Sequence, residues 1–502
     1  MAQIETEMRD RPEHVTPQSL ADVAALLGVS APRTDASITG ISLASTSVIP
    51  GDLYAALKGA STHGAKFAAD AAERGAVAIL TDIEGAKLAA DAGIPAIFVD
   101  DPRACLGVIA SAIYERPSTA FTTIGITGTQ GKTTTTYLAE AAIRGAGLRP
   151  AVIGTIGTRI AGVPVKTSLT TPEAPALQAL FAVMREARVD VCAIEVSSHA
   201  LVLGRADATL FDAAVFLNLG RDHLDFHNDL EDYFDAKAML FTPEHAQRAV
   251  INLDDAYGRR LIARTTLPVT TFSTEGPADW RAYNIRAHRS GSDVDILGSD
   301  GRERTMSVPL AGAFNVSNAV AVVAALSTVG LDPDAVIAGI EALEGVPGRL
   351  ERVDLGQPFI TLIDYAHKPD ALTAVLTALR PQTPGRLIIV MGAGGDRDRG
   401  KRPLMGEVVS RLADIVLVTD DNPRSEDPAT IRAAVRAGAT GNAVVIDAPG
   451  RRDAIAQAIA LARSGDTLLI AGKGHETGQE IAGVTHPFDD RDVVRELLGG
   501  SS

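Results

Sequence analysis

A glycine-rich loop between a short apolar strand and a helix is the clearest chemical feature of this 502-residue sequence. The loop, Gly128-Thr-Gln-Gly-Lys-Thr-Thr134, follows an expected strand at 123–127 and opens a helix expected over 134–144. Backbone N–H groups in such a turn cradle phosphates, Lys132 reaches the β/γ oxygens, and the Thr133 hydroxyl can bind Mg²⁺. Residue 126 is Ile rather than Gly, so the loop is a shorter variant of the common motif. The residues predicted to bind a nucleotide here are Gly128, Thr129, Gln130, Gly131, Lys132, Thr133 and Thr134.

An acidic residue stands near the end of the apolar run 191–196, in the string Glu195-Val-Ser-Ser-His199. Ligands of open α/β sheets bind beyond the carboxyl ends of the strands, where this carboxylate would emerge. Because Mg²⁺ prefers oxygen ligands, Glu195 is predicted to bind the ion beside Thr133. A carboxylate at a strand end is otherwise most often a helix cap, so this interpretation depends on the phosphate loop.

A third polar cluster, Asn218-Leu-Gly-Arg-Asp-His-Leu-Asp-Phe-His227, also follows an apolar strand. Its two histidines and two aspartates could indicate zinc, but no cysteine or H-x-x-x-H helix pattern accompanies them. A cation-binding role for His223 beside the nucleotide is preferred. Lys237 follows in Tyr233-Phe-Asp-Ala-Lys237, where an exposed helix lysine is the ordinary interpretation.

Four polar strings in the last third of the chain each follow or adjoin an expected strand, so they should gather on one face of a sheet. They are Asp364-Tyr-Ala-His-Lys-Pro-Asp370, residues 392–402, Asp421-Asn-Pro-Arg424 and Gly472-Lys-Gly-His-Glu476. The second string fails the dinucleotide-binding pattern G-x-G-x-x-G because residue 397 is Arg. Its several Arg and Lys side chains beside glycines suit a carboxylate or phosphate, with a solvated charge run as the alternative.

Short β-branched runs alternate with Ala/Leu-rich helical stretches along the chain, which predicts an α/β fold with largely parallel sheets. Breaks containing Pro or Gly at 115–118 and 345–348 divide it into expected domains at residues 1–118, 119–347 and 348–502. Expected strands include residues 76–80, 96–99, 123–127, 191–196, 214–218, 386–391, 415–419 and 467–471.

Composition limits the function classes. The chain is 46% hydrophobic and 22% charged, as globular domains are, and its net charge of -15 argues against nucleic acid as a partner. The two cysteines, Cys105 and Cys192, are expected to be free thiols, which suits a reducing cytoplasm. Residues 1–16 lack the apolar core of a signal peptide, and no apolar run reaches bilayer-spanning length. A cytoplasmic monomer that is not inserted in a membrane is the working expectation.

Taken together, these strings resemble the Mur ligase family over nearly the whole chain, from about Ser45 to the end. The resemblance is carried by residues 127–134, 195–199, 221–225, 364–367 and 394–397. Asp421-Asn-Pro-Arg424 resembles the signature by which diaminopimelate-adding members differ from lysine-adding members. The resemblance implies an N-terminal UDP-muramoyl-binding α/β domain, a central P-loop ATPase domain with a mainly parallel sheet, and a C-terminal Rossmann-like domain that binds the amino acid.

The resemblance also implies site residues. Those matching contacts to the UDP-muramoyl dipeptide are Leu43, Ser45, Thr62, His63, Thr170, Thr171, Ser197 and Arg205, while Leu169 and Leu203 stand where some members carry polar ligands. Those for ATP, beyond the loop, are Asn315, Asn318 and Asp364, with His367 and Lys368 as further candidates for ATP contacts or closure. Those for diaminopimelate are Arg397, Asp421, Asn422, Pro423, Arg424, Gly472 and Glu476. The implied catalytic residues are Lys132, His223, Lys237 and Arg349, and the implied Mg²⁺ ligands are Thr133, Glu195, His223 and Lys237 as its carbamate.

The implied reaction uses ATP and Mg²⁺ to phosphorylate the D-glutamyl γ-carboxylate of UDP-N-acetylmuramoyl-L-Ala-D-Glu, after which the amine of meso-diaminopimelate attacks the acyl phosphate. The lysine-adding member of the family and a folylpolyglutamate-type ligase are the nearest alternatives. A P-loop regulatory NTPase would leave the C-terminal loops without a purpose. A non-enzymatic nucleotide-sugar-binding module would leave Lys132 and Glu195 unexplained.

Overall fold

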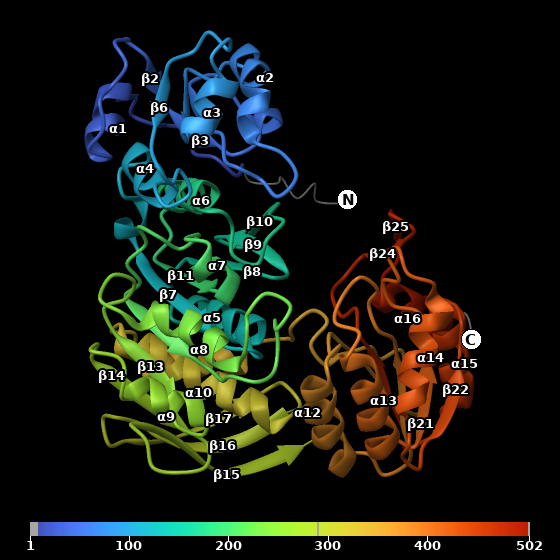
Figure 1. The fold of residues 1–502 in the computed structure, drawn as a ribbon. Coiled ribbons are helices and arrows are strands. Elements are labelled where there is room, and N and C mark those ends of the chain that lie inside the picture. Colours follow the sequence, from blue (N-terminus) through green and yellow to red (C-terminus); the bar gives the residue numbers. More distant parts are fainter. Residues whose placement is uncertain (1–8, 289–290, 500–502) are drawn as a thin grey trace.

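The computed structural model describes residues 9–288 and 291–499, which form three successive parts, each built on a β-sheet (Figure 1). Residues 1–8, half of the polar N-terminal segment, lie outside the described residues. In the first part, four parallel strands run in the order β3-β4-β5-β6. Its elements are β1 (Gln18–Ser19), α1 (Leu20–Leu26), β2 (Ser37–Ile38), β3 (Gly40–Ser42), β4 (Asp52–Ala55), α2 (Ala68–Glu73), β5 (Ala78–Thr81), α3 (Ile83–Leu88), β6 (Ala96–Phe98) and α4 (Leu106–Ile113).

The second part has an eleven-stranded sheet in the order β10-β9-β8-β11-β7-β12-β13-β14-β15-β16-β17. The strands from β8 to β15 in this order pair in parallel, which confirms the predicted mainly parallel sheet. Its elements are β7 (Thr122–Thr127), α5 (Lys132–Gly145), β8 (Pro150–Gly154), β9 (Gly157–Ile160), β10 (Val163–Val165), α6 (Ala174–Glu186), β11 (Val191–Glu195), α7 (Ser198–Val202), β12 (Ala213–Phe216), α8 (Leu230–Ala238), β13 (Ala249–Asn252), α9 (Ala256–Ile262), β14 (Val269–Ser273), β15 (Trp280–His288), β16 (Gly291–Leu297), β17 (Glu303–Val308), α10 (Ala313–Thr328) and α11 (Pro333–Glu341).

Both ends of this sheet are antiparallel, through β9 and β10 on one side and β16 and β17 on the other. These end strands were not predicted from the sequence. Polar residues alternate with apolar ones along β16 and β17, because only one face of each strand is buried. A search for continuous apolar runs therefore passes over them.

The third part has six strands in the order β18-β19-β23-β20-β21-β22, parallel except for β18. Its elements are β18 (Glu351–Arg352), β19 (Ile360–Asp364), α12 (Pro369–Leu379), β20 (Leu387–Met391), α13 (Lys401–Leu412), β21 (Ile415–Val418), α14 (Pro428–Gly438), β22 (Val444–Asp447), α15 (Arg451–Leu461), β23 (Thr467–Ala471), β24 (Gly478–Ile481), β25 (Val484–Pro487) and α16 (Asp490–Gly499). The four predicted polar strings leave the carboxyl ends of β19, β20, β21 and β23, so they share one edge, as predicted.

Strand β7 lies in the middle of the central sheet, with helices covering both faces (Figure 1). Ile124 and Ile126 pack into a core with α5, α10 and α11. On the neighbouring strand β11, Cys192 and Ile194 point into the opposite core, which includes α6, α7 and α8. Each such buried side chain contributes about 1.5–3 kcal/mol, so the strand that leads to the phosphate loop is held rigidly from both sides.

The sequence also predicted free cysteines and no membrane-spanning segment. Cys105 and Cys192 are both free thiols, as predicted, and Cys192 is fully buried, which raises its pKa. No helix in the part of the chain that the structure describes is long and apolar enough to cross a bilayer.

Glycines allow α11 to cross close to α5, the helix that begins at Lys132. A β-carbon built on Gly339 would lie 2.5 Å from the carbonyl oxygen of Ala141 and 2.7 Å from the Cα of Ala142. Gly339→Leu should therefore push the helices apart and lower the free energy of unfolding by about 1–3 kcal/mol.

Thermal unfolding of the variant beside Ala338→Leu measures this effect. Ala338 is exposed on the same helix, and its replacement should change stability by less than about 0.5 kcal/mol. Equal unfolding midpoints for the two leucine variants would contradict the close helix contact.

Candidate active site

The loop between β7 and α5 has the backbone geometry of a phosphate-binding turn. Gly131 has a φ of 87°, and a β-carbon there would lie 2.5 Å from Oδ1 of Asn318, so only glycine fits. The backbone N–H groups of Thr129 and Gln130 donate to Oδ1 of Asn218 at 3.1 and 2.9 Å. The loop is thus fixed from two sides, with the amino end of α5 open to an anion. The helix begins at Lys132 rather than at the predicted residue 134.

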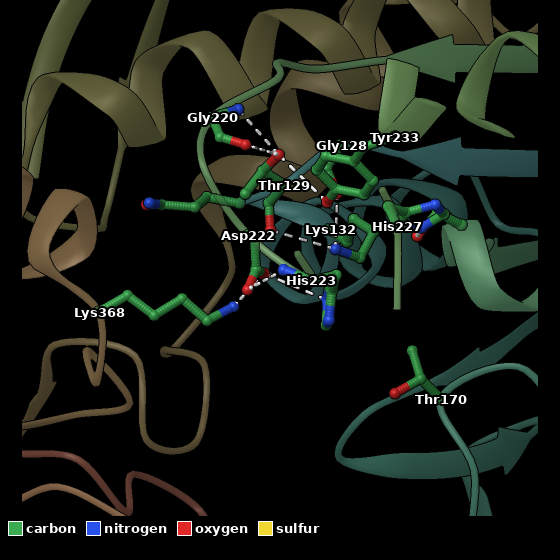
Figure 2. Close-up of polar contacts among 12 residues, drawn as sticks. Gly128, Thr129, Lys132, Thr170, Gly220, Asp222, His223, His227, Tyr233 and Lys368 are labelled. Atoms are coloured by element: carbon green, nitrogen blue, oxygen red, sulfur yellow. Dashed lines mark hydrogen bonds and ion pairs between the residues drawn. The ribbon is translucent and has the colours of Figure 1, made fainter. Parts of the chain in front are cut away.

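Two lysines converge on one carbonyl oxygen of this loop. Figure 2 shows the first of them, Lys132, beside Gly128. Nζ of Lys132 donates to the carbonyl oxygen of Gly128 at 2.7 Å, and Nζ of Lys237, from α8, donates to the same oxygen at 3.1 Å. Neither forms an ion pair with a carboxylate among residues 9–288 and 291–499. The site is therefore a cluster of positive charge ready for an anion.

Lys237 is not the exposed helix lysine that its sequence context suggested. Its side chain is 1% exposed and lies 4.5 Å from the centre of the Tyr233 ring. Burial, and then the charge of Lys132, lowers its pKa well below the ordinary value. Burial likewise lowers the pKa of Lys132. A larger fraction of Lys237 is therefore the neutral amine at physiological pH than is usual for lysine.

Glu195 lies at the carboxyl end of β11 and is 1% exposed. Its Oε1 accepts from the backbone N–H of Thr155 at 2.9 Å, and its Oε2 accepts from the Thr155 hydroxyl at 3.0 Å. The carboxylate therefore caps no helix, and lone pairs remain for another ligand. Thr133 presents its hydroxyl nearby in the loop, where it accepts from Nη2 of Arg349 at 3.3 Å.

These oxygens suit Mg²⁺, which is commonly held by one or two carboxylates together with substrate phosphates. Across the described ranges, 9–288 and 291–499, no group of three or more His, Cys, Asp or Glu side chains could hold a metal by itself. A cation here would depend on hydroxyl, phosphate or further oxygen ligands in addition to Glu195.

Asp222, His223 and Lys368 form a polar cluster beside the loop, with Lys368 reaching in from the C-terminal part (Figure 2). Nε2 of His223 lies 3.1 Å from Oδ2 of Asp222, and the Lys368 ammonium pairs with the same oxygen. Although burial opposes the shift, Lys368 and His223 lower the pKa of Asp222 to about 2. Burial lowers the pKa of His223 to about 4, so its imidazole is neutral at pH 7. A neutral imidazole can bind a metal ion, but it adds no positive charge beside a phosphoryl group.

The linker between the second and third parts is held by Arg349 and Asp364. The Arg349 guanidinium lies 4.5 Å from the centre of the Tyr365 ring while it reaches Thr133. Both oxygens of Asp364 accept backbone N–H groups, from Leu350 at 2.8 Å and Ala366 at 2.7 Å. Burial raises the pKa of Asp364, against the effect of Arg349. Asp364 thus anchors the linker, which is a structural role beyond the predicted nucleotide contact.

The other predicted nucleotide residues lie close to the loop. Nδ2 of Asn315 donates to the carbonyl oxygen of Ala311 at 2.7 Å, and its Oδ1 accepts from Asn318 at 3.1 Å. His367 is half-buried, and desolvation together with the charges of Lys368 and Lys401 lowers its pKa to about 3. Asn318, and Asn315 through it, thus lie beside Gly131 of the phosphate loop, and their contact with a nucleotide stays a prediction.

Residues predicted to contact the UDP group lie in loops that follow β3 and β4 of the N-terminal sheet. Leu43 and Thr62 are partly exposed, and Ser45 is buried at the start of a 3₁₀ turn. His63 is buried: its Nδ1 accepts from the N–H of Ala65 at 3.1 Å and its Nε2 lies 3.1 Å from Asp82. The His63 ring therefore holds this loop together, which limits what it can offer a ligand.

Residues predicted to contact the muramoyl peptide gather around Glu195. Thr171 donates to the carbonyl oxygen of Glu195 at 2.7 Å, and the Thr170 hydroxyl lies 3.1 Å from that of Thr155. Ser197 caps α7, with its hydroxyl accepting from the N–H of Ala200. Arg205 is paired with Glu173 at 2.9 Å. In Figure 2, Thr170 lies apart from the cluster around Lys132.

The C-terminal loops form a second candidate site. A β-carbon on Gly395 would lie 1.9 Å from the carbonyl oxygen of Pro423, so the loops after β20 and β21 are in direct contact. Arg424 has a φ of 53°, and its Nη1 donates to the carbonyl oxygen of Gly395 at 2.7 Å. Its Nε lies 3.2 Å from Oε2 of Glu480, on β24. These contacts orient the guanidinium, and Arg397 is exposed on the neighbouring loop.

Three residues in contact with these sites were not predicted. Thr155 binds Glu195, Glu480 pairs with Arg424, and Lys473 is buried beneath Asn422 and Glu476. Lys473 lies in the string Gly472-Lys-Gly-His-Glu476, whose two glycines around a lysine were a usable signal. The contacts of Thr155 and Glu480 depend on chain packing and leave no trace in local sequence.

Comparison with known proteins agrees with this geometry. Three family profiles match in chain order: the Mur ligase family catalytic domain at residues 37–117, the Mur ligase middle domain at 126–326, and the Mur ligase glutamate ligase domain at 348–474. The chain is 53% identical to the UDP-N-acetylmuramoyl-L-alanyl-D-glutamate--2,6-diaminopimelate ligase of Streptomyces avermitilis, over 97% of this chain and 98% of the relative. The chain belongs to the Mur ligase family.

Solved structures give the same result at the level of the fold. A structure of a UDP-N-acetylmuramoyl-L-alanyl-D-glutamate--2,6-diaminopimelate ligase matches with a TM-score of 0.68 and 33% identity, over 97% of this chain and 99% of that one. Folylpolyglutamate synthase of Mycobacterium tuberculosis matches with a TM-score of 0.61 and 22% identity, but over 74% of this chain. That second likeness concerns the fold alone.

Lys132→Ala should abolish ligation and leave the fold intact. The ammonium is placed to meet phosphate oxygens, and its removal leaves no paired carboxylate without a partner. Turnover should fall more than about 30-fold, which corresponds to a barrier increase of about 2 kcal/mol. Steady-state phosphate release, with circular dichroism as the folding control, measures this, and a smaller loss would contradict the assignment of the loop.

Proposed function

We propose that this chain joins meso-diaminopimelate to the D-glutamyl γ-carboxylate of UDP-N-acetylmuramoyl-L-alanyl-D-glutamate, with hydrolysis of ATP to ADP and phosphate. The observation that carries this proposal is its 53% identity, over nearly the full length of both chains, to a relative that bears the name of that ligase. The oriented guanidinium of Arg424, on the same edge of the sheet as the loops that carry Asp421 and Glu476, supports it.

The chemistry requires activation, because hydroxide is too poor a leaving group for direct amide formation. An oxygen of the γ-carboxylate attacks the γ-phosphorus of ATP, the bond to ADP breaks, and an acyl phosphate forms. The amine nitrogen of the amino acid then attacks the acyl carbon, loses a proton, and phosphate leaves. Lys132 and Arg349 are placed to neutralise charge on the transferring phosphoryl group. Mg²⁺, when bound, would be held by Thr133, Glu195 and phosphate oxygens and would neutralise further charge.

Each part of the chain has a role in this proposal. Residues 1–118 would hold the UDP-muramoyl group, residues 119–347 the ATP, and residues 348–502 the amino acid. The cross-contacts Lys368 to Asp222 and Arg349 to Thr133 join the amino-acid part to the nucleotide part, which lets the two reactants meet. Exclusion of water from the acyl phosphate would follow from closure of these parts. We place the reaction in the cytoplasm and expect a monomer to perform it.

Lys237 would act as its carbamate. The neutral amine attacks the carbon of CO₂ and loses a proton, which converts a cation into an anionic oxygen ligand. Burial favours this reaction because it lowers the pKa of the amine. The contact of the Lys237 amine with Gly128 supports a position of the carbamate beside the phosphate loop. A carbamate would supply the additional oxygen ligand that Thr133 and Glu195 leave open for Mg²⁺.

Lys237→Ala should be nearly inactive, and buffer freed of bicarbonate should lower the activity of the unaltered protein. The matched control is Lys66→Ala, which removes an exposed lysine of the N-terminal part and should alter neither result. Phosphate release in both buffers measures this. If Lys237→Ala works normally with and without bicarbonate, Lys237 has no catalytic role.

Two alternatives stay within related chemistry. A lysine-adding enzyme would have the same fold and the same phosphate loop, and would differ in the pocket of the C-terminal part. A folylpolyglutamate-type ligase is disfavoured because that likeness leaves about a quarter of this chain unmatched. The amino acid is therefore the feature that an experiment must establish.

Phosphate release with the UDP-muramoyl dipeptide and each amino acid in turn tests the proposed function. Meso-diaminopimelate carries a second carboxylate that lysine lacks, and Arg424 can bind it through two parallel hydrogen bonds. Sites built around a polar partner reject analogues that lack it by about 10⁴ or more, so kcat/KM should strongly favour diaminopimelate.

Arg424→Ala should lose most of that preference, with KM for diaminopimelate rising far more than KM for ATP. The control is Arg436→Ala, which removes an exposed arginine paired with Asp447 on the same part of the chain and should change neither constant. Equal kcat/KM for lysine and diaminopimelate in the unaltered protein would contradict the proposal.

A further inference from the structure

A buried lysine lies directly beneath the proposed amino-acid pocket. Lys473 follows β23, and its side chain is 0% exposed. It is flanked by Gly472 with a φ of 119° and Gly474 with a φ of 54°. These left-handed conformations reverse the chain on both sides of Lys473, which allows its side chain to enter the domain while the loop itself lines the pocket.

The ammonium group has two defined partners, and both belong to the predicted pocket. Nζ of Lys473 donates to Oδ1 of Asn422 at 3.1 Å and lies 3.0 Å from Oε2 of Glu476. Nδ2 of Asn422 donates to the same Oε2 at 2.9 Å. The three side chains therefore form a closed triangle of hydrogen bonds.

This triangle fixes which way the Asn422 amide points. Its Oδ1 accepts from Lys473 and also from the backbone N–H of Glu480 at 3.0 Å. A rotated amide would direct its NH₂ group at an ammonium and at an N–H group, which is unfavourable. Only one orientation satisfies every partner.

The contacts also decide which acceptors remain for a substrate. Oδ1 of Asn422 already has two donors, so it is not free to accept from the far ammonium group of diaminopimelate. Oε2 of Glu476 has two donors as well. Oδ1 of Asp421 accepts the N–H of Asn422 at 2.7 Å. Within residues 9–288 and 291–499, Oδ2 of Asp421 and Oε1 of Glu476 accept no hydrogen bond, so these carboxylate oxygens remain for a substrate.

The loop that carries Lys473 cannot easily move. A β-carbon on Gly348, in the linker, would lie 2.2 Å from the backbone nitrogen of His475, and one on Gly474 would lie 2.8 Å from the carbonyl oxygen of Gly348. The linker thus packs directly on the loop. Lys473 is held between the linker on one side and the pocket on the other.

We propose that Lys473 is a positioning residue for the amino-acid site. By holding Asn422 and one oxygen of Glu476, it selects Asp421 and the other oxygen of Glu476 as the acceptors for the ammonium group of the incoming amino acid. This inference rests on the proposed function, because it concerns the same pocket.

Lys473→Met, which keeps the length of the side chain and removes its charge, tests the proposal. KM for diaminopimelate should rise at least tenfold, while KM for ATP and for the UDP-muramoyl dipeptide should stay within about twofold, because the phosphate loop is untouched. Lys473→Gln serves as a second variant if the methionine variant does not fold, since it can still donate to Asn422. Because it keeps this donor and lacks the charge that pairs with Glu476, its KM for diaminopimelate should rise selectively but less than that of Lys473→Met.

The matched control is Arg386→Met, which removes a cation from an ion pair with buried Asp466 at the opposite edge of the same sheet. It should reduce stability without a selective change in KM for diaminopimelate. The inference is overturned if the unaltered protein releases phosphate with diaminopimelate but the Lys473 variants keep all three KM values or raise them in parallel. The proposed function would still stand in that case. If the unaltered protein releases no phosphate with diaminopimelate, the proposed function itself is overturned.

Discussion

The electrostatics of the candidate active site depend on two lysines, the buried Lys237 and the partly buried Lys132, that share one carbonyl oxygen. Lys132 and Lys237 both donate to the oxygen of Gly128, and neither has a carboxylate partner among residues 9–288 and 291–499. Two like charges in a buried site are costly unless one is neutralised or an anion arrives. Burial, and then the charge of Lys132, lowers the pKa of Lys237. A bound phosphate, or the proposed conversion of the Lys237 amine to a carbamate, would offset the positive charge of this site.

In the proposed reaction, the C-terminal part would bring an amino acid to that charged site. Its four loops leave one edge of a parallel sheet, and Asp364 and Arg349 fix the linker that joins this edge to the phosphate loop. Lys368 crosses to Asp222 and adds a second connection. The linker also touches the loop that carries Lys473 through Gly348 and Gly474, so the linker and the proposed amino-acid site are packed together.

Much of this was readable from local sequence, because strand ends and glycine loops follow local rules. The phosphate loop, Glu195 at the end of β11, and the shared edge of the C-terminal loops were all predicted correctly in place. The burial of Lys237, the use of the His63 ring within its own loop, and the saturation of Asn422 by Lys473 were not. Each depends on which distant segment packs against the residue, and that is decided by the tertiary fold. The antiparallel strands β15 to β17 were missed for a simpler reason, since their half-exposed faces lack continuous apolar runs.

The central claim is that a γ-carboxylate is activated by phosphorylation and then captured by an amine, and transfer of oxygen tests it most directly. The UDP-muramoyl dipeptide would be prepared with ¹⁸O in both oxygens of the D-glutamyl γ-carboxylate, then incubated with ATP, Mg²⁺ and meso-diaminopimelate. If an acyl phosphate forms, one labelled oxygen leaves with the phosphate and the other stays in the new amide, as mass spectrometry of both products would show. Unlabelled phosphate accompanying amide formation would contradict the account.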